Sequence, residues 1–318
     1  MKEFKNKTIL VTGGTGSIGS EIVRQLLASE AAQIRIYSRD EHKQHELKQE
    51  LGTDSRLRYL LGDVRDKDRL EYAMHGVHVV FHAAALKHVP FCEYNPFEAV
   101  KTNITGTQNV IDAALKYNIE KVVAVSTDKA VNPKSVLGAT KLMMERLITA
   151  ANAMAGTHRT RFSCVRFGNV INSRGSVVHL WRKQIEQGGP VTVTDKRAVR
   201  FFMEIEEAAH LIFDACRLMK GGEIFVLKMK RRGIVEFAKQ TIRAHGNGEE
   251  VPITFIGLRP GEKLDEALLT HNELSHTLEV ENMFVIIPEE IFPSSGLGDI
   301  YVYKGARKAR KSHYVSRS

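Results

Sequence analysis

Short hydrophobic runs alternate with amphipathic stretches along the first half of the chain. The runs typical of buried strands are KTILVTG, QIRIYS, LRYLLGD, VHVVFHAA, EKVVAVST and RFSCVRFGNV. Helix-length segments separate them, such as SEIVRQLLAS, in which Ile22, Val23, Leu26 and Leu27 share one face. This alternation predicts a parallel sheet covered on both faces by helices. Right-handed crossovers then give an α/β fold with a doubly wound parallel sheet of the Rossmann type, whose ligands bind at the carboxyl ends of the strands.

The pattern becomes irregular after about Val170, where short segments rich in arginine and glycine interrupt it. We therefore expect residues 1–170 to form the Rossmann domain, with its sheet completed by parts of 200–230, including the run EIFVLK. Residues 171–290 should form a smaller, discontinuous substrate lobe. Residues 291–318 are predicted to be a basic, mobile tail.

The composition is that of a globular protein without membrane insertion. Of the 318 residues, 43% are hydrophobic and 26% are charged, and the hydrophobic runs are shorter than the roughly 20 residues of a membrane-spanning helix. The start MKEFKNKTILVTGG enters a strand without the apolar run of a signal peptide. These features lead us to expect a cytoplasmic protein.

The net charge of +9 raises the question of nucleic-acid binding, but the charge is unevenly distributed. Six Lys or Arg and no acidic residue lie between Lys304 and Ser318, which leaves +3 for the rest of the chain. We therefore predict no nucleic-acid partner. The three cysteines, Cys92, Cys164 and Cys216, are widely spaced and form no CxxC pair, so they predict neither a metal site nor disulfides.

The first strand leads directly into a glycine-rich turn that opens a helix. Gly13, Gly16 and Gly19 have the spacing GxxGxxG, in which missing side chains let the backbone approach a pyrophosphate. The helix N-terminus adds unpaired N–H groups and a positive dipole. A dinucleotide is therefore expected here, bound by residues of this turn: Gly13, Thr15, Gly16, Ser17, Ile18 and Gly19.

The end of the second strand indicates which dinucleotide binds. Ser38 and Arg39 occupy the place where NAD-specific folds carry a carboxylate for the ribose 2′-hydroxyl. A guanidinium can instead bind a 2′-phosphate, which favours NADP, although a register shift to Asp40 would restore a carboxylate. Asp63 and Val64 follow the third strand and are expected near the adenine, unless Asp63 is only a turn or cap residue. The predicted NADP site also includes Ala83 and Lys141.

Five segments in order carry a family resemblance: TGGTGSIG, HAAALKHVP, STDKAVNP, GATK and LRPGEK. With them the chain resembles the UDP-N-acetylglucosamine 4,6-dehydratases of polysaccharide biosynthesis, over roughly residues 6 to 280. The resemblance implies an extended short-chain dehydrogenase with a UDP-N-acetylhexosamine substrate. Its YxxxK element falls on Leu137 to Lys141, so the usual tyrosine is absent, as it is in some family members that carry methionine there. Leucine cannot ionise, and the chemistry moves to Thr127, Asp128 and Lys129.

The implied reaction needs an acid and a base beside a hydride carrier. Oxidation at sugar C4 acidifies the C5 proton, a base removes it, an acid protonates the departing C6 hydroxyl, and the hydride returns to C6. The resemblance assigns the C5 proton to Lys129, and we assign the C6 hydroxyl to Asp128. Both then need shifted pKa values in a closed site, because the lysine must be neutral and the aspartate protonated. Lys141 should stay charged and bridge the nicotinamide ribose.

Anchors for the UDP diphosphate and the sugar should lie in the second lobe and at its border. The resemblance implies the following set: Lys87, Asn169, Arg174, Ser176, Val177, Arg200, Arg259 and Glu262. His82 and Asn103 are interpreted as structural residues instead.

Two other functions remain open. A UDP-hexose 4-epimerase shares the C4 oxidation but needs neither a base for C5 nor an acid for C6, so Asp128 and Lys129 favour the dehydratase. A non-catalytic NADP-binding protein would explain Leu137 but not the retention of Lys129 and Lys141. By analogy with the family we also expect a homo-oligomer.

Overall fold

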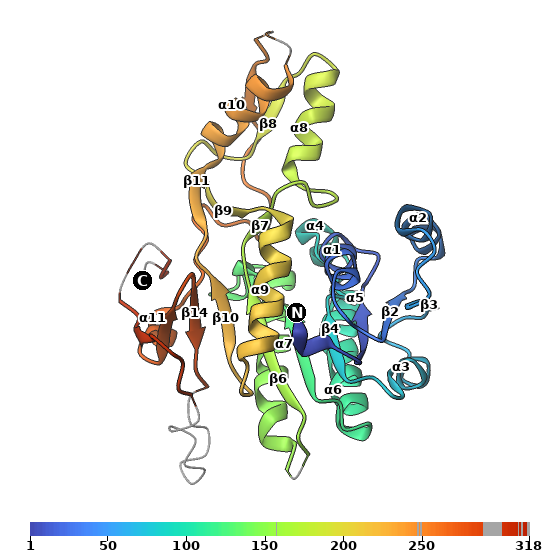
Figure 1. Cartoon of the computed structure of the whole chain (residues 1–318). Helices are drawn as coiled ribbons and strands as arrows, with labels where there is room; N and C mark the ends of the chain where they lie inside the picture. Colours follow the sequence, from blue (N-terminus) through green and yellow to red (C-terminus); the bar gives the residue numbers. More distant parts are fainter. Residues whose placement is uncertain are drawn as a thin grey trace.

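The computed structural model describes residues 1–156, 158–246, 248, 250–288, 301–310, 312 and 314–316. In this part of the chain ten strands form one sheet, in the order β15-β13-β14-β10-β6-β5-β4-β1-β2-β3, with helices on both faces (Figure 1). The predicted doubly wound α/β fold is confirmed. The strands of this sheet are β1 (Thr8–Thr12), β2 (Gln33–Ser38), β3 (Leu57–Leu61), β4 (Val79–His82), β5 (Lys121–Val125), β6 (Arg161–Arg166), β10 (Ile224–Leu227), β13 (Thr277–Val280), β14 (Met283–Ile286) and β15 (Arg307–Lys308).

The strands from β3 to β10 in this order are parallel, and β14 then pairs with β10 in the antiparallel direction. Ile9, Leu10 and Val11 of β1 are fully buried, as expected for a strand covered on both faces. The run EIFVLK supplies β10, so its predicted return to the sheet is confirmed. The strand order reverses at β1 and β4, and a ligand crevice opens at such a switch point.

The helices connect these strands and pack in groups. α1 contacts α9, which also contacts β5 and β6, whereas α6 contacts both α3 and α7. The chain is helical from Pro96 to Lys116, with a π-helical turn at Lys101–Thr105. The bounds are α1 (Ser17–Leu27), α2 (Glu41–Leu51), α3 (Lys67–Met74), α4 (Val89–Tyr94), α5 (Pro96–Val100), α6 (Gly106–Lys116), α7 (Val136–Met154), α9 (Ile205–Leu218) and α11 (His271–Leu274), with 3-10 turns at Lys2–Phe4 and Asp128–Ala130.

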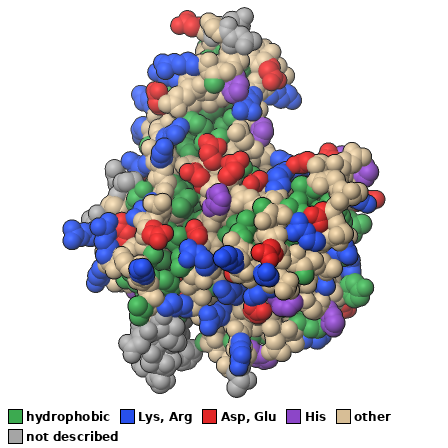
Figure 2. All heavy atoms as spheres, in the orientation of Figure 1, with side chains coloured by type: hydrophobic (Ala, Val, Ile, Leu, Met, Phe, Trp, Pro, Cys, Tyr) green, Lys and Arg blue, Asp and Glu red, His purple; other side chains and the backbone are tan. Residues whose placement is uncertain are grey.

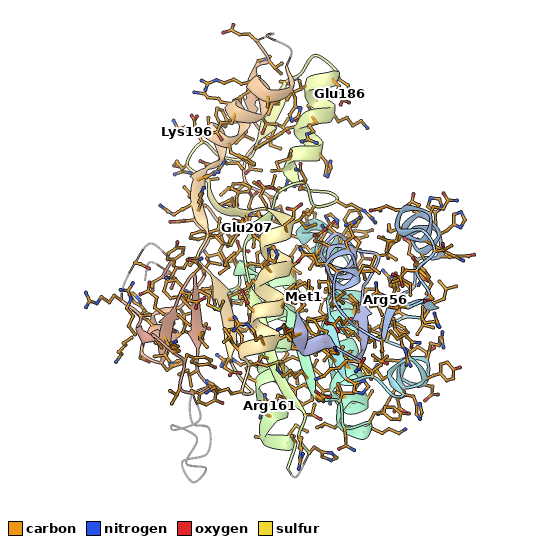
Figure 3. All side chains as sticks on the ribbon, in the orientation of Figure 1. Met1, Arg56, Arg161, Glu186, Lys196 and Glu207 are labelled. Carbon is orange, nitrogen blue, oxygen red and sulfur yellow. The ribbon has the colours of Figure 1, made fainter. Side chains whose placement is uncertain are left out.

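A smaller lobe rises above the carboxyl ends of the parallel strands, at the top of Figure 1. Its own core contains Trp181, Phe202 and Phe237. In Figure 3, Glu186 and Lys196 mark this lobe, and Arg161 lies at the opposite end of the molecule. The lobe consists of α8 (Val177–Glu186), α10 (Ile234–His245), the sheet β11-β9-β7 and the pair β12-β8, with β7 (Asn169–Val170), β8 (Val191–Val193), β9 (Val199–Met203), β11 (Lys230–Gly233) and β12 (Ile253–Phe255).

The prediction of a mobile basic tail is wrong for the described residues beyond 300. β15 pairs with β13, the Tyr303 hydroxyl donates to Glu223 at 2.6 Å, and the Tyr314 ring stacks on Phe201. The prediction rested on the basic residues of this segment and overlooked its tyrosines, whose contacts with distant residues hold the segment against the rest of the fold. Residues 291–300, 311, 313, 317 and 318, which belong to the same prediction, lie outside the described residues.

The charges on the surface and the state of the cysteines can be compared with the sequence analysis. On the face shown in Figure 2, acidic and basic side chains are interspersed over both the sheet domain and the small lobe. Cys92, Cys164 and Cys216 are buried free thiols, as predicted. In the described ranges, no helix is both long and apolar enough to cross a bilayer.

Candidate active site

A cleft of about 860 Å³ separates the carboxyl ends of the parallel strands from the small lobe. Its lining comes from the glycine turn, the ends of β2 to β6, the start of α8, and the segment 259–266. The two predicted ligand regions therefore share one continuous cavity. Such a crevice between a sheet edge and a second lobe is a common ligand site.

The glycine turn has the geometry of a pyrophosphate cradle. Gly13 has a positive φ of 65°, and a Cβ there would lie 2.7 Å from the Ala84 nitrogen. A Cβ on Gly19 would lie 2.2 Å from the Gly13 oxygen, so neither position accepts a side chain. α1 starts at Ser17 without a side-chain cap, which leaves its first N–H groups directed at the cleft. Thr15, Gly16 and Ile18 also line the cavity.

Ser38 and Arg39 lie at the end of β2 beside this turn. The Ser38 hydroxyl is buried and bonds the Thr15 hydroxyl at 2.7 Å. Arg39 is more than half exposed and its Nη1 is 3.5 Å from an Asp63 oxygen, so its guanidinium is accessible from the cleft. Asp40 caps α2 by accepting from the Lys43 backbone and also pairs with the Lys43 ammonium at 2.5 Å. The Asp40 carboxylate thus has a structural role, which weakens the alternative that it binds a ribose.

The opposite wall of the cofactor region comes from β3 and β4. Asp63 accepts three hydrogen bonds from Arg65, which outweigh the effect of burial and lower the pKa of the Asp63 carboxyl. Val64 is buried and lines the cleft next to Asp63, and Ala83 lies against Gly13. All three residues therefore line the cleft, and Asp63 also has the turn role considered as its alternative.

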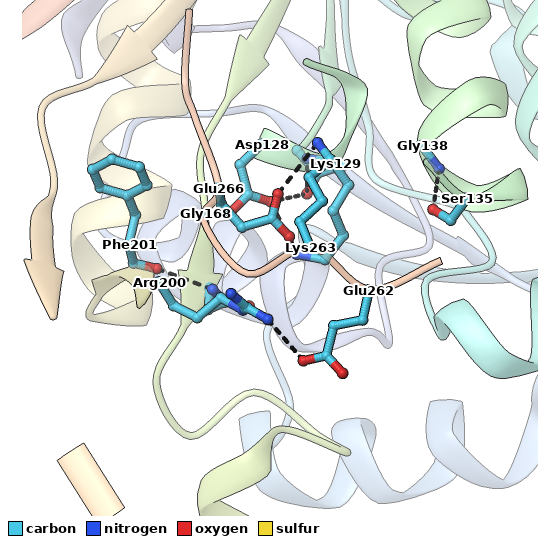
Figure 4. Close-up of polar contacts among 12 residues, drawn as sticks. Asp128, Lys129, Ser135, Gly138, Gly168, Arg200, Phe201, Glu262, Lys263 and Glu266 are labelled. Atoms are coloured by element: carbon cyan, nitrogen blue, oxygen red, sulfur yellow. Dashed lines mark hydrogen bonds and ion pairs between the residues drawn. The ribbon is translucent and has the colours of Figure 1, made fainter. Parts of the chain in front are cut away.

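The strand β5 delivers the predicted catalytic segment to the cleft. Thr127 and Lys129 line the cavity, whereas Asp128 lies behind them and is fully buried. Asp128 Oδ1 accepts from the Thr127 hydroxyl at 2.9 Å and from Lys129 Nζ at 3.0 Å, and its Oδ2 is buried without a partner among the described residues (Figure 4). The acid and the amine that the chemistry needs are thus in direct contact.

The protonation state of Lys129 differs from the sequence expectation. Burial favours the neutral amine, but the negative charges of Asp128 and Glu266 outweigh it, and the pKa of Lys129 is raised above its ordinary value. In the ligand-free site Lys129 is therefore an ammonium. The carboxylate nearest to this ammonium is that of Asp128, whose Oδ1 lies 3.0 Å from Nζ.

Leu137 and Lys141 lie four residues apart on the first turns of α7, which begins after the Ser135 cap. Lys141 Nζ donates to the Val125 carbonyl at 2.8 Å, and burial lowers the pKa of this lysine to about 8. Below that pH it stays charged, as predicted. Leu137 is buried against Cys92 and Ala99 at the cleft wall, so an apolar side chain occupies the position of the family's tyrosine.

An ion pair connects two of the predicted substrate anchors. Arg200 of β9 is buried and donates to Glu262 Oε1 at 2.7 Å and to the Leu264 carbonyl at 3.0 Å. The pairing of Arg200 with Glu262 is drawn in Figure 4. Glu262 also accepts from the Arg259 backbone at 3.2 Å, which brings Arg259 to the same wall of the cleft. Arg200 is about sixty positions from Arg259 and Glu262 in the sequence but adjacent to them in the fold, which agrees with a common role.

The start of α8 forms another wall of the small-lobe side. Ser176 occupies the cap position, but its hydroxyl is buried without a partner among the described residues, and Val177 follows it at the cleft. Asn169 donates to the Phe201 carbonyl at 3.2 Å and also lines the cavity. An uncapped helix N-terminus with a free hydroxyl suits an anionic group.

Arg174 lies at the junction between the two ligand regions. Its backbone N–H donates to the Ser17 hydroxyl and its guanidinium to the Thr15 carbonyl, both at 2.9 Å. Lys87 Nζ donates to the Arg174 carbonyl at 2.6 Å, and burial lowers the pKa of Lys87. Arg174 thus joins the small lobe to the glycine turn and faces both regions.

His82 and Asn103 are structural, as predicted. His82 is buried between the hydroxyls of Thr12 and Thr107, and burial lowers its pKa to about 3, which keeps it neutral. Asn103 bonds both backbone groups of Leu86.

Sequence reasoning missed two residues of the site, Lys263 and Glu266. Both line the cleft, and Glu266 approaches Lys129 from a segment more than a hundred positions away. Both residues closely follow the motif LRPGE, and this proximity could have indicated them. The polar residues of the segment were interpreted only as far as Glu262.

Comparisons with known proteins agree with this geometry. The chain is similar to a UDP-N-acetylglucosamine 4,6-dehydratase (inverting) of Campylobacter jejuni, with 45% identity over 287 residues that cover 90% of this chain and 84% of that protein. It is also similar to a UDP-glucose 4-epimerase of Rickettsia canadensis, with 40% identity over 287 residues that cover 89% of this chain and 83% of that protein. The solved structure of Pen from Bacillus thuringiensis has a TM-score of 0.88 and 45% identity, covering 91% of this chain and 90% of that one.

A family model described as polysaccharide biosynthesis protein matches residues 9–288, which include every predicted site residue. This match agrees with the resemblance carried by TGGTGSIG, STDKAVNP and LRPGEK. The chain belongs to the polysaccharide biosynthesis protein family.

Proposed function

We propose that the protein is an NADP-dependent 4,6-dehydratase that converts a UDP-N-acetylhexosamine, UDP-N-acetylglucosamine being the first candidate, to the 4-keto-6-deoxy sugar. The observation that carries this proposal is the contact between Asp128 and Lys129 at 3.0 Å, at the sheet edge where a nicotinamide would lie. Elimination across C5 and C6 needs such an acid and base together, and the similar Campylobacter jejuni protein bears the name of this activity.

A dinucleotide fits the glycine turn because Gly13 and Gly19 leave no room for side chains and α1 offers free N–H groups. When bound, its nicotinamide would supply the hydride acceptor and donor of the reaction. Support for NADP comes from the exposed Arg39 guanidinium and from Asp40, whose carboxylate is engaged by Lys43. A 2′-phosphate could therefore pair with Arg39 and meet no free carboxylate from Asp40.

The chain's own groups can perform the proton steps. Transfer of the Lys129 proton to Asp128 converts an ion pair into a neutral amine and a carboxylic acid, which are the base for C5 and the acid for the C6 hydroxyl. Thr127, which donates to the same Asp128 oxygen, orients that carboxyl. Lys141 would hold the nicotinamide ribose. Since Leu137 cannot ionise, the C4 proton must go to one of the polar groups of this segment or to a water molecule held there.

The small-lobe wall is the proposed site of the UDP group. Arg200 and Arg259 supply positive charge, and Ser176 with Val177 supplies the start of α8. Arg174, between the glycine turn and the small lobe, would lie between the two diphosphates. Lys87, Asn169 and Glu262 would orient the sugar and these cations.

An epimerase is the second candidate, because a Rickettsia canadensis relative of 40% identity carries that name. The two activities give different products from the same substrate. Incubation of the purified protein with UDP-N-acetylglucosamine and NMR of the product is the direct test. A 4-keto-6-deoxy sugar supports the proposal, whereas a product that keeps its C6 hydroxyl and differs only at C4 establishes the epimerase. No product, despite tight binding of both ligands, indicates a non-catalytic protein.

We also propose that the protein self-associates. Phe91, Tyr94 and Phe97 are more than 70% exposed. They are three positions apart in the sequence and lie on the adjoining helices α4 and α5. An apolar surface of this kind commonly marks a protein contact, and a second copy of the chain is its simplest occupant. A monomeric mass in light scattering at micromolar concentration would contradict this proposal.

A further inference from the structure

Glu266 is a buried carboxylate at the wall of the active-site cleft that the mechanism above does not use. It is 5% exposed, and it comes from the segment that follows the LRPGE residues rather than from the sheet edge. Its Oε1 lies 3.9 Å from Lys129 Nζ, and its Oε2 lies 3.4 Å from Lys263 Nζ. That Oε2 is buried and accepts no hydrogen bond from the described residues. Burying a carboxylate in this way is costly unless its charge is used.

Four charged groups of alternating sign contact one another in succession and cluster together in Figure 4, namely Asp128, Lys129, Glu266 and Lys263. Lys129 therefore lies between two carboxylates, that of Asp128 in the core and that of Glu266 at the cleft wall. The remaining charge that acts on Lys129 is Arg200, which disfavours the ammonium and is itself paired with Glu262. The carboxylates of Asp128 and Glu266 thus both stabilise the ammonium of Lys129.

We propose that Glu266 is a positioning residue of this site, which shares the ammonium of Lys129 with Asp128 and governs the pH at which Lys129 becomes a free amine. The inference rests on the proposed role of Lys129 as the base for C5. Asp128 alone already neutralises Lys129 and gives it a hydrogen bond, so a structural ion pair does not require a second carboxylate. The added anion instead makes loss of the proton harder until the substrate fills the cleft, which prevents a free amine from forming in the open site.

The direction of the effect follows from electrostatics. A carboxylate about 4 Å from an amine stabilises its charged form, and an opposite charge at this range shifts a pKa by about 1–3 units. Burial lowers the pKa of Lys129, but the negative charges of Asp128 and then of Glu266 outweigh burial, and the net shift is upward. Replacing Glu266 by its neutral isostere should therefore lower the pKa of Lys129 by about one unit, the lower end of that range.

The test compares Glu266→Gln with wild type and with Asp265→Asn as a matched control. Asp265 is the adjacent acidic residue, but it pairs with Arg231 and does not line the cleft. The first measurement is the pH profile of kcat/KM for UDP-N-acetylglucosamine. Its alkaline limb, where Lys129 loses the proton that it must pass to Asp128, should move about one unit to lower pH in Glu266→Gln, at the expected scale for one charge, and should stay in place in Asp265→Asn.

The second measurement does not depend on turnover. Reductive dimethylation with 13C-formaldehyde labels lysines, and the resonance absent from Lys129→Arg identifies Lys129, whose side chain is 23% exposed and so within reach of the reagent. Its titration midpoint should fall in Glu266→Gln and not in Asp265→Asn. Glu266→Asp keeps the charge on a side chain one methylene shorter and should give a smaller shift of the titration midpoint in the same direction. This variant provides the test if Glu266→Gln does not fold.

The outcomes separate the two proposals. An unchanged alkaline limb and an unchanged Lys129 titration in Glu266→Gln would overturn the role of Glu266, even if the wild type makes the 4-keto-6-deoxy product. Absence of that product from the wild type, together with a shifted Lys129 titration, would contradict the proposed function and leave the charge coupling of Glu266 and Lys129 supported.

Discussion

The conversion of Lys141 to methionine should stabilise the protein while it removes activity. Lys141 is 7% exposed, and burial lowers its pKa from 10.5 to about 8. Keeping this lysine charged in the folded protein below pH 8 therefore costs about 3 kcal/mol, since each pKa unit corresponds to roughly 1.4 kcal/mol. Methionine has a similar length and removes the buried charge.

The substitution also has a cost, because the Val125 carbonyl loses the donor that now lies 2.8 Å away. An unsatisfied acceptor of this kind costs about 1–2 kcal/mol, so the net gain in the free energy of unfolding should be about 1–2 kcal/mol at pH 7. In a protein of this size that corresponds to a rise in Tm of roughly 2–4 °C per kcal/mol.

The pH dependence distinguishes this mechanism from improved packing. Between about pH 8 and 10.5 the unfolded chain binds the Lys141 proton and the folded wild type does not. Wild-type stability therefore rises with pH in this window relative to the variant, and the gap between them should close. The assay is urea unfolding of ligand-free protein from pH 6.5 to 10, with Lys134→Met as a control at an exposed position. A Lys141→Met variant that is less stable than wild type at pH 7, or a gap independent of pH, would refute the reasoning.

Three other predictions concern ligands and turnover. Arg39→Asp should reverse a preference for NADP over NAD of about 1–3 kcal/mol, measured by calorimetry, and equal affinities in the wild type would contradict the role of Arg39. Lys129→Ala and Asp128→Asn should each lower kcat by roughly 100-fold or more, whereas Leu137→Ala should cost much less, and a larger loss in the leucine variant would contradict these roles. Arg200→Ala should weaken UDP binding without affecting NADP, because it leaves Glu262 and the diphosphate without their cation, and unchanged UDP affinity would show that the diphosphate lies elsewhere.

The sheet and its cofactor edge follow from local features of the sequence. Runs such as KTILVTG are apolar because both faces of the strand are covered, and the turn from Gly13 to Gly19 has a spacing that only close backbone approach explains. Patterns of this kind depend on neighbouring residues only, so they can be recognised in the sequence. The positions of Arg39, Lys129 and Lys141 at the cleft were therefore predictable.

Features that depend on distant segments were not predictable in the same way. The docking of the residues beyond 300 depends on contacts of Tyr303 with Glu223 and of Tyr314 with Phe201, which leave no periodic pattern. The raised pKa of Lys129 depends not only on the adjacent Asp128 but also on Glu266, more than a hundred positions away. Sequence spacing does not encode such distances, so the charge state of Lys129 needed the structure.

The transfer of hydrogen from C4 to C6 within one sugar is the central claim, and an isotope experiment measures it directly. UDP-N-acetylglucosamine carrying deuterium at C4 should give, in ordinary water, a 4-keto-6-deoxy product with that deuterium in its C6 methyl group. The unlabelled substrate in deuterated water should acquire deuterium at C5, where the Lys129 base exchanges the proton. Deuterium that returns to C4, in a product that keeps its C6 hydroxyl, would contradict the account.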